Sequence, residues 1–225
     1  MMITIKNNQQ TGQAVTEYAL LLVLVAGVVV FALALIGPRV ADSFAEVSEC
    51  LAGTHQYELV NGSFGADSLI TSRWRAYDAG AITGWDTTAG DNRIEIWYTG
   101  FLGVPAPNGR YLAELNANQP SALYQDIETV PGERMVWSFS HRGRSGVDTM
   151  EVRIGPPGAT VSQEQISTGR SWQQYDGVYE GPEGQTTTRF EFAAVRTATG
   201  NLSVGTLLDN VRFGLACGYE EDVAE

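Results

Sequence analysis

The side chains that could do catalytic chemistry are few and scattered. His55 and His141 are the only histidines, and Lys6 is the only lysine, so a chain cut after its first residues has no lysine for Schiff-base chemistry. The sequence has no G-x-S-x-G motif, no metal-spaced His/Cys cluster and no phosphate-binding glycine loop. We therefore predict a protein that is not an enzyme. A membrane-anchored glycosidase needs only two carboxylates, so it stays open as a lesser alternative.

A compact basic loop is better suited to binding. His141, Arg142 and Arg144 lie in the run HRGRSG, which follows an apolar stretch and precedes Asp148. Arginine makes bidentate contacts with carboxylates, so this loop could bind carboxylated sugars. The alternative, which we favour, is local pairing of its charges with Asp148 and nearby acids.

Aromatic side chains form the second group of candidate binding residues. Rings exposed on a surface stack on the faces of sugar rings, but most of the five Trp residues of one domain are expected in its core. Trp74 and Tyr77, in the loop-like run SRWRAYDAG, are the aromatic residues that we expect to be exposed.

Two cysteines, Cys50 and Cys217, flank most of the chain that follows the N-terminal segment. In an exported protein an even number at the edges of a domain favours a disulfide. Closing so long a loop would contribute about 5 kcal/mol in the chain-entropy model. The alternative is a pair of unrelated thiols.

The bulk composition limits the partners. A chain of 225 residues can hold one mid-sized domain and an appendage. Its formal charge of −12 makes nucleic acid and anionic membrane surfaces poor partners. The acidity suits a protein that must stay soluble outside the cell.

An apolar run from Ala19 to Ile36 dominates the N-terminus and is long enough to span a bilayer as a helix. A secretory signal peptide would have a shorter apolar core and a basic start. A simple membrane anchor explains the run but not Glu17 directly before it, and a buried soluble helix rarely has so long an unbroken apolar stretch.

The residues before this run carry a more specific pattern. Gly12, Gln13, Glu17 and Tyr18 lie in the sequence GQAVTEY, and the apolar run follows at once. This pattern resembles the processing site of Flp-type (tight-adherence, type IVb) pilins. The resemblance implies cleavage by a prepilin peptidase between Gly12 and Gln13, with the carboxylate at the fifth mature position.

The carboxylate of Glu17 supports an assembly role. A carboxylate that enters an apolar helix bundle needs a cationic partner, and the processed chain has no lysine. The new amino terminus of a neighbouring subunit at Gln13 is the nearest candidate, and this pairing would set the axial stagger of a filament. The alternative is a Glu17 that reaches into interfacial water.

The rest of the chain predicts an antiparallel β-sandwich. Polar and apolar residues alternate in short runs, for example in 135–140, 149–154 and 189–195, and turn sequences separate the runs. Helical periodicity is absent from this region, so the fold class is mainly β. The further expected strands are 57–64, 93–99, 110–116, 122–129, 171–180 and 206–213.

Several of these segments occur in an order that resembles the galactose-binding-like jelly rolls of carbohydrate-binding modules. They are LVNGSF at 59–64, ITGWDTT at 82–88, GRYLAELNA at 109–117, LYQDIETVPG at 123–132 and LLDNVRF at 207–213. The resemblance implies a jelly roll and, less specifically, glycan binding, because one fold serves many binding roles.

Asp209 is a candidate metal ligand. It falls in the run LLDNVRF in phase with apolar Leu207 and Val211, and an acid on an apolar face must be paired, neutralised or metal-bound. Modules of the resembled family often hold a structural calcium ion where the first and last strands meet. Asn61, the carbonyl of Gly62 and Asp209 could supply its oxygen ligands. The alternative is an aspartate that caps backbone amides.

These observations predict four segments: a leader (1–12), a transmembrane and assembly helix (13–51), a jelly-roll sandwich (52–217) and an acidic tail (218–225). The expected function is a type IVb (Flp/Tad-like) pilus subunit, a minor or specialised pilin that displays an adhesive or glycan-binding module on the cell surface. Its partners would be other pilin subunits, prepilin peptidase, the assembly machinery and surface glycans. It would lie in the inner membrane as a precursor and then in the extracellular pilus. The alternative is a structural pilin or pseudopilin whose sandwich only packs or caps the filament.

Overall fold

The computed structural model describes residues 17–27, 30 and 59–215. The chain divides into two compact units, Met1–Thr54 and His55–Glu225. The predicted processing residues Gly12 and Gln13, and the predicted disulfide partners Cys50 and Cys217, lie outside the described residues.

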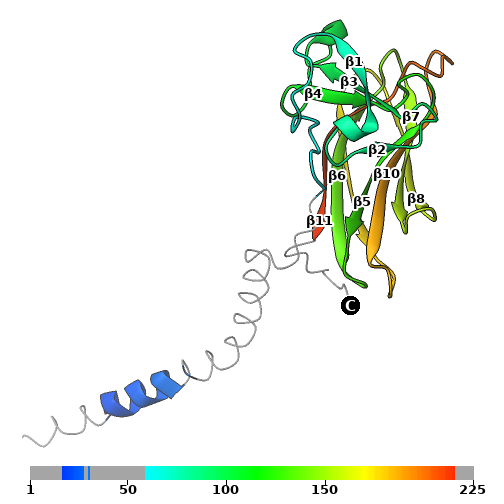
Figure 1. Ribbon diagram of the computed structural model, residues 1–225. Coiled ribbons are helices and arrows are strands. Elements are labelled where there is room, and N and C mark those ends of the chain that lie inside the picture. Colours follow the sequence, from blue (N-terminus) through cyan, green and yellow to red (C-terminus); the bar gives the residue numbers. More distant parts are fainter. Residues whose placement is uncertain (1–16, 28–29, 31–58, 216–225) are drawn as a thin grey trace, which may run out of the picture. The chain divides into compact units, whose positions relative to one another are not determined.

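In the first unit, residues 17–27 form a helix, drawn in blue in Figure 1. Tyr18 and the apolar side chains from Leu20 to Val25 are all exposed on it. Among the described residues no helix is long and apolar enough to cross a membrane. Most of the second half of the predicted apolar run lies outside them.

The second unit is an antiparallel sandwich of two sheets (Figure 1). Sheet A has the strand order β1-β3-β4-β11-β6-β9, and sheet B has the order β2-β5-β10-β7-β8. The strands are β1 (Trp74–Asp78), β2 (Asp86–Thr87), β3 (Arg93–Tyr98), β4 (Tyr111–Glu114), β5 (Ala122–Glu128), β6 (Arg134–Arg142), β7 (Asp148–Gly155), β8 (Val161–Thr168), β9 (Gln173–Glu180), β10 (Thr187–Arg196) and β11 (Leu207–Leu215). Two 3₁₀ turns, η1 (Ala79–Ala81) and η2 (Phe101–Gly103), lie between strands.

The predicted sandwich is confirmed, and so are most of its strands. The prediction of a strand at 57–64 is wrong for the residues that the structure describes. They form a turn in which Asn61 and Phe64 each have a positive φ angle of 55°. This turn still lies along β11, because the Leu59 N–H donates to the Phe213 carbonyl and the Val211 N–H to the Gly62 carbonyl. The sequence pattern also missed β1, β2 and β8.

The predicted alternation fixes the core. Met135, Trp137 and Phe139 of β6 point between the sheets, where they meet Phe190 and Phe192 of β10. Phe139 packs against Phe192 with ring centres 4.9 Å apart and nearly perpendicular planes. Burying such side chains contributes roughly 1.5–3 kcal/mol each, so this alternation is the main reason that the two sheets pack.

Strand β11 contains a bulge that changes which of its side chains face the core. Its pairing with β6 shifts between Asp209 and Arg212, and Asn210 has a φ angle of 53°. The extra residue turns Val211 and Phe213 into the core, whereas Asp209 lies opposite Ser140 on the outer face of sheet A. The predicted common phase of Asp209 with Val211 is therefore wrong, because period two does not continue through a bulge.

A loop between β3 and β4, residues 99–110, covers part of that outer face. Beneath it Trp97, Leu112 and Leu207 form a second apolar cluster with Val104 of the loop. The loop is held at its base by a hydrogen bond from the Thr99 N–H to the Arg110 carbonyl, 2.8 Å long. Trp97, although on the outer face, is therefore fully buried.

Candidate functional site

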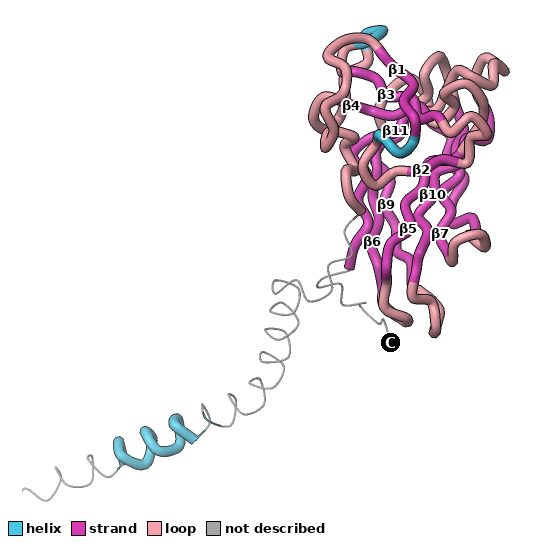
Figure 2. The backbone as a smooth tube through the Cα atoms, viewed as in Figure 1, coloured by secondary structure: helices cyan, strands magenta, loops and turns pink. Residues whose placement is uncertain are grey.

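Loops gather at one end of the sandwich and create a small pocket there. Figure 2 shows them in pink around β1, β3 and β4. The strand registers place the ends of β6, β8 and β10 together at this end. The pocket has a volume of about 300 Å³ and is called the arginine pocket below. Its lining residues are Trp97, Leu102, Val104, Arg142, Arg144, Ser145, Arg170 and Val204.

Arg144 lines one wall of the pocket, and its guanidinium is paired with a buried carboxylate. Its Nη1 donates to both carboxylate oxygens of Glu114, at 2.9 and 3.0 Å, and Glu114 is fully buried. Its guanidinium carbon lies 4.8 Å from the centre of the Trp97 ring, within the range of cation–π attraction. Of the two interpretations of the basic loop, local pairing is therefore correct for Arg144. Its guanidinium pairs with Glu114, and its backbone N–H donates to the carboxylate of Asp148 at 2.7 Å.

A second carboxyl group lies beside Glu114. Glu95 accepts a 2.6 Å hydrogen bond from the Trp97 indole N–H and is hydrogen-bonded to Glu114. Burial and the charge of Glu95 raise the pKa of Glu114 to about 8, although Arg144 and the Gly205 N–H oppose this shift. A hydrogen bond between two carboxyl groups needs a proton, so the pair carries one negative charge, which Arg144 balances.

Arg142 and Arg170 also line the pocket. They differ from Arg144 in the carboxylate partner that it has and they lack among the described residues. Arg142 is only 8% exposed, and its Nε donates to the Gly143 carbonyl at 3.3 Å. Its pKa is lowered by burial and by the neighbouring charge of Arg170. Within residues 17–27, 30 and 59–215, neither Arg142 nor Arg170 has a carboxylate partner. The sequence pattern did not include Arg170, which the β8–β9 loop brings to the pocket.

His141 does not belong to this pocket. It is the penultimate residue of β6 rather than part of a loop, and its side chain is fully buried between the sheets. Nδ1 lies 2.8 Å from the Thr168 hydroxyl, and burial lowers the pKa of the imidazole to about 3. The prediction of His141 as part of a basic binding loop is therefore wrong, because strand alternation points it inward.

Trp74 is the predicted aromatic residue that the structure leaves exposed. It lies in β1, an edge strand of sheet A, rather than in a loop as predicted, and 47% of its surface is exposed. It pairs directly with Trp97, so both lie on the outer face of sheet A and Trp74 is one strand away from the arginine pocket. Among the described tryptophans it is the exposed one: Trp85, Trp97 and Trp137 are buried, and Trp172 is half-buried.

Tyr77 is a weaker candidate than predicted. Its hydroxyl accepts a 2.9 Å hydrogen bond from the Ile70 N–H, and the guanidinium carbon of Arg75 lies 5.4 Å from its ring centre. The side chain is only partly exposed and packs against the core. Tyr77 therefore anchors the segment before β1, whereas Trp74 offers a more open surface.

The three predicted calcium ligands already accept hydrogen bonds from backbone amides. Asp209 accepts from the N–H groups of Asn108 (2.9 Å) and Asn210 (2.6 Å). The Gly62 carbonyl accepts from Val211, and Asn61 Oδ1 accepts from Ala66 at 2.9 Å. Burial raises the pKa of Asp209 to about 7 despite its two donors. This arrangement matches the alternative of an aspartate that caps amides.

Calcium at this place stays a prediction. Within the described residues no group of three or more His, Cys, Asp or Glu side chains is arranged to hold a metal ion. A calcium site here would have to rely on carbonyl and amide oxygens next to Asp209, since Ca²⁺ takes six to eight oxygen ligands.

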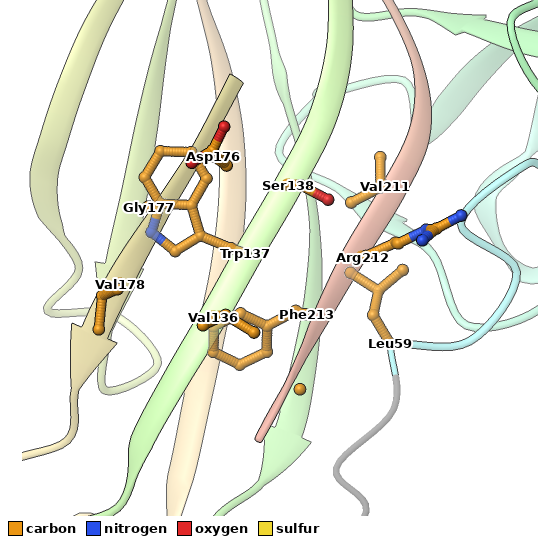
Figure 3. Close-up of a pocket in the computed structure, with 11 residues that line it drawn as sticks. Leu59, Val136, Trp137, Ser138, Asp176, Gly177, Val178, Val211, Arg212 and Phe213 are labelled. Carbon is orange, nitrogen blue, oxygen red and sulfur yellow. The ribbon is translucent and has the colours of Figure 1, made fainter. Parts of the chain in front are cut away.

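A larger groove of about 560 Å³ lies on the open half of the outer face of sheet A (Figure 3). Val136 and Ser138 of β6, Asp176 and Val178 of β9 and Arg212 of β11 line it. Trp137, although adjacent, is 5% exposed and packs in the core. Among the described residues that line it, the groove thus offers no open aromatic ring, which makes it less suited to sugar stacking than the surface around Trp74.

Comparisons with known proteins identify no family for this chain. No family model and no curated protein matches it. Solved structures that match include TmCBM61 in complex with β-1,4-galactotriose (15% identity, 71% of this chain and 98% of the other, TM-score 0.44). Another is the CBM22-1 xylan-binding domain of Paenibacillus barcinonensis Xyn10C (12%, 67% and 100%, TM-score 0.44). A third is a CBM4 module (15%, 70% and 99%, TM-score 0.39).

These neighbours are carbohydrate-binding modules, but with TM-scores below 0.5 and identities of 15% or less the similarities carry no argument about what this chain binds. The two-sheet antiparallel architecture follows from the strand pairing of the chain itself. The side chains of the outer face of sheet A are therefore what indicates its function.

Proposed function

We propose that the chain is a subunit of a type IVb (Flp/Tad-like) pilus that displays its sandwich on the cell surface as a glycan-binding module. The observation that carries the glycan-binding part is Trp74. A large apolar ring that stays 47% exposed on an edge strand needs an explanation in a domain whose other Trp side chains are buried or half-buried. Stacking on a sugar ring is the use that its open face fits best.

The surroundings of Trp74 suit a saccharide. The ring lies on the same face as the arginine pocket, and Trp97 is its direct cross-strand neighbour. A flat aromatic surface next to a polar pocket is the arrangement by which binding sites hold one sugar unit by stacking and orient it by hydrogen bonds.

The pilus part of the proposal depends on the N-terminal sequence. Gly12, Glu17 and Tyr18 stand at the spacing of a prepilin processing site, followed by the apolar run. In the described helix, residues 17–27, the apolar side chains are exposed, so they require a membrane or other subunits to cover them. A precursor in the inner membrane and a filament outside the cell supply these two environments in turn.

Two measurements test the proposal separately. The intact mass of the chain from sheared filaments should correspond to an N-terminus at Gln13, and a chain that still begins at Met1 would contradict the pilus assignment. A glycan array probed with the full chain in detergent should show saturable binding to a defined set of oligosaccharides. A chain that assembles into filaments but binds no glycan would instead be a structural pilin.

A further inference from the structure

The arginine pocket has an imbalance of charge that the fold does not explain. Arg142 is the one arginine among the described residues that is buried, and it has no carboxylate partner. By contrast, Arg144, Arg153 and Arg189 are more exposed and each forms an ion pair with a glutamate or aspartate. The chain has a net charge of −12, so acidic side chains are not scarce.

The neighbours of Arg142 make the imbalance larger. Arg170 is close enough for its charge to disfavour the charged form of Arg142. Arg144 does not add to this excess, because its charge is balanced by the Glu95–Glu114 pair below it. Both arginines line the pocket, Arg142 buried and Arg170 exposed, and no carboxylate of the described residues pairs with either of them. A like charge beside a buried guanidinium disfavours its charged form, and an anionic ligand would relieve this.

The volume of the pocket and its other lining residues restrict the class of ligand that it can hold. About 300 Å³ is at the lower end of the range for small-molecule sites and suits a single sugar unit rather than a long chain. Leu102, Val104 and Val204 provide apolar surface for the C–H face of a ring, and Ser145 adds a hydroxyl group. A single guanidinium group can bind a carboxylate through two parallel hydrogen bonds, and a second one nearby adds positive charge.

We propose that the arginine pocket is the acidic subsite of the glycan site, in which Arg142 and Arg170 bind the carboxylate of a uronic acid unit. This inference rests on the proposed glycan binding, because it places one charged unit of the glycan beside the unit that stacks on Trp74. Arg144 has a positioning role: it lines the pocket and holds its shape, but its own charge is already paired with Glu114.

A matched pair of ligands tests the inference. The full chain in detergent is titrated with an oligogalacturonide and with the same oligosaccharide fully methyl-esterified, which differs by one methyl group on each carboxylate and has no charge. The acid should bind about tenfold to a hundredfold more tightly, the range expected for a charge-assisted contact. Arg170→Gln should remove this preference. Arg93→Gln, which makes the same charge change at an exposed site outside the pocket, should keep it.

The possible outcomes distinguish failure of the acidic subsite from failure of the proposed glycan binding. If acid and ester bind equally well to the wild-type chain, the acidic subsite is wrong but glycan binding stands. If neither binds, the proposed function itself is wrong. If inorganic sulfate displaces the acid at the same concentration as free galacturonate does, the pocket is a general anion site and the assignment to uronic acids fails. Arg142→Gln serves as a second variant, and loss of the preference in both supports the subsite.

Discussion

The guanidinium carbon of Arg144 lies 4.8 Å from the centre of the Trp97 indole ring, while the Trp97 indole N–H donates to Glu95. One stacked pair thus joins the β6–β7 loop to β3. The Arg144 side chain is also held by Glu114 of β4, so the β6–β7 loop meets the two consecutive strands β3 and β4 at one guanidinium group. This arrangement sets the position of the pocket wall.

Removing Arg144 should destabilise the fold. Arg144→Gln leaves the buried Glu95–Glu114 pair without its cation, and breaking a buried ion pair by deleting one partner costs about 3 kcal/mol. Urea denaturation of the full chain in detergent, followed by tryptophan fluorescence, measures this loss. The exposed Arg93→Gln should change the free energy of unfolding by less than about 0.5 kcal/mol. Equal stability of the two variants would show that the cluster contributes nothing.

Stability should also fall as the pH rises. The pKa of Glu114 is raised from its ordinary value of 4.5 to about 8 in the folded chain, chiefly by burial and then by Glu95. The folded state therefore binds more protons than the unfolded state between these values. The contribution of protonated Glu114 to the free energy of unfolding is fully present below pH 4.5 and is lost as the pH rises through about 8.

The urea midpoint measured from pH 4.5 to pH 9 tests this dependence. Glu114→Gln keeps the shape and removes the titration, so its curve should be flatter than that of the wild type. A part of the slope should remain, because burial also raises the pKa of Asp209, to about 7. A wild-type stability that increases over this range would contradict the raised pKa of Glu114.

Gly177 is required by the close approach of Trp137. A Cβ atom at Gly177 would lie 2.2 Å from Trp137 Cζ2, far inside contact distance. Gly177→Ala should therefore lower the free energy of unfolding by about 1–3 kcal/mol, the usual cost of overpacking a core. At Gly90 the nearest atom to an added Cβ is 3.8 Å away, so Gly90→Ala is the matched control. Thermal unfolding of both variants decides the point, and an unchanged Gly177→Ala midpoint would contradict it.

Glu17 should act in assembly rather than in insertion. Glu17→Gln keeps the side-chain shape and removes the charge that would pair with the amino terminus of a neighbouring subunit, so membrane levels should be normal and filament levels low. In a strain without the wild-type copy, the two levels are compared in membrane and sheared-filament fractions. Wild-type amounts of Glu17→Gln in sheared filaments would rule out Glu17 as the contact that sets the stagger.

The alternation of apolar and polar residues was enough to predict the sandwich and the inward side chains of β6, β7 and β10. It failed where the period is broken or absent. The bulge at Asn210 inverts the facing of the rest of β11, and β8 is a mostly exposed edge strand with no apolar alternation. His141 was misplaced because HRGRSG reads as a loop, whereas β6 continues to Arg142.

The candidate site could be predicted only in part. Trp74, Arg142 and Arg144 were identified from residue type, and the structure places them on one face or at one pocket. Arg170 and the Glu95–Glu114 pair were missed, because their roles arise from contacts with residues outside their own strand or loop: Glu95 faces Glu114 across the β3–β4 pair, and Arg170 reaches the pocket from the β8–β9 loop. A lone arginine before a strand, or a glutamate in one, carries no local pattern that indicates such a contact.

The most direct test of the central claim is a glycan array that compares the wild-type full chain with Trp74→Ala. Because Trp74 is exposed at an edge strand, its removal should leave the thermal unfolding midpoint nearly unchanged. We predict that the wild-type chain binds a defined set of oligosaccharides and that Trp74→Ala weakens this binding by about tenfold or more, as expected when a stacking contact is lost. Wild-type binding that is undiminished in Trp74→Ala, or no binding by either chain, would contradict the account.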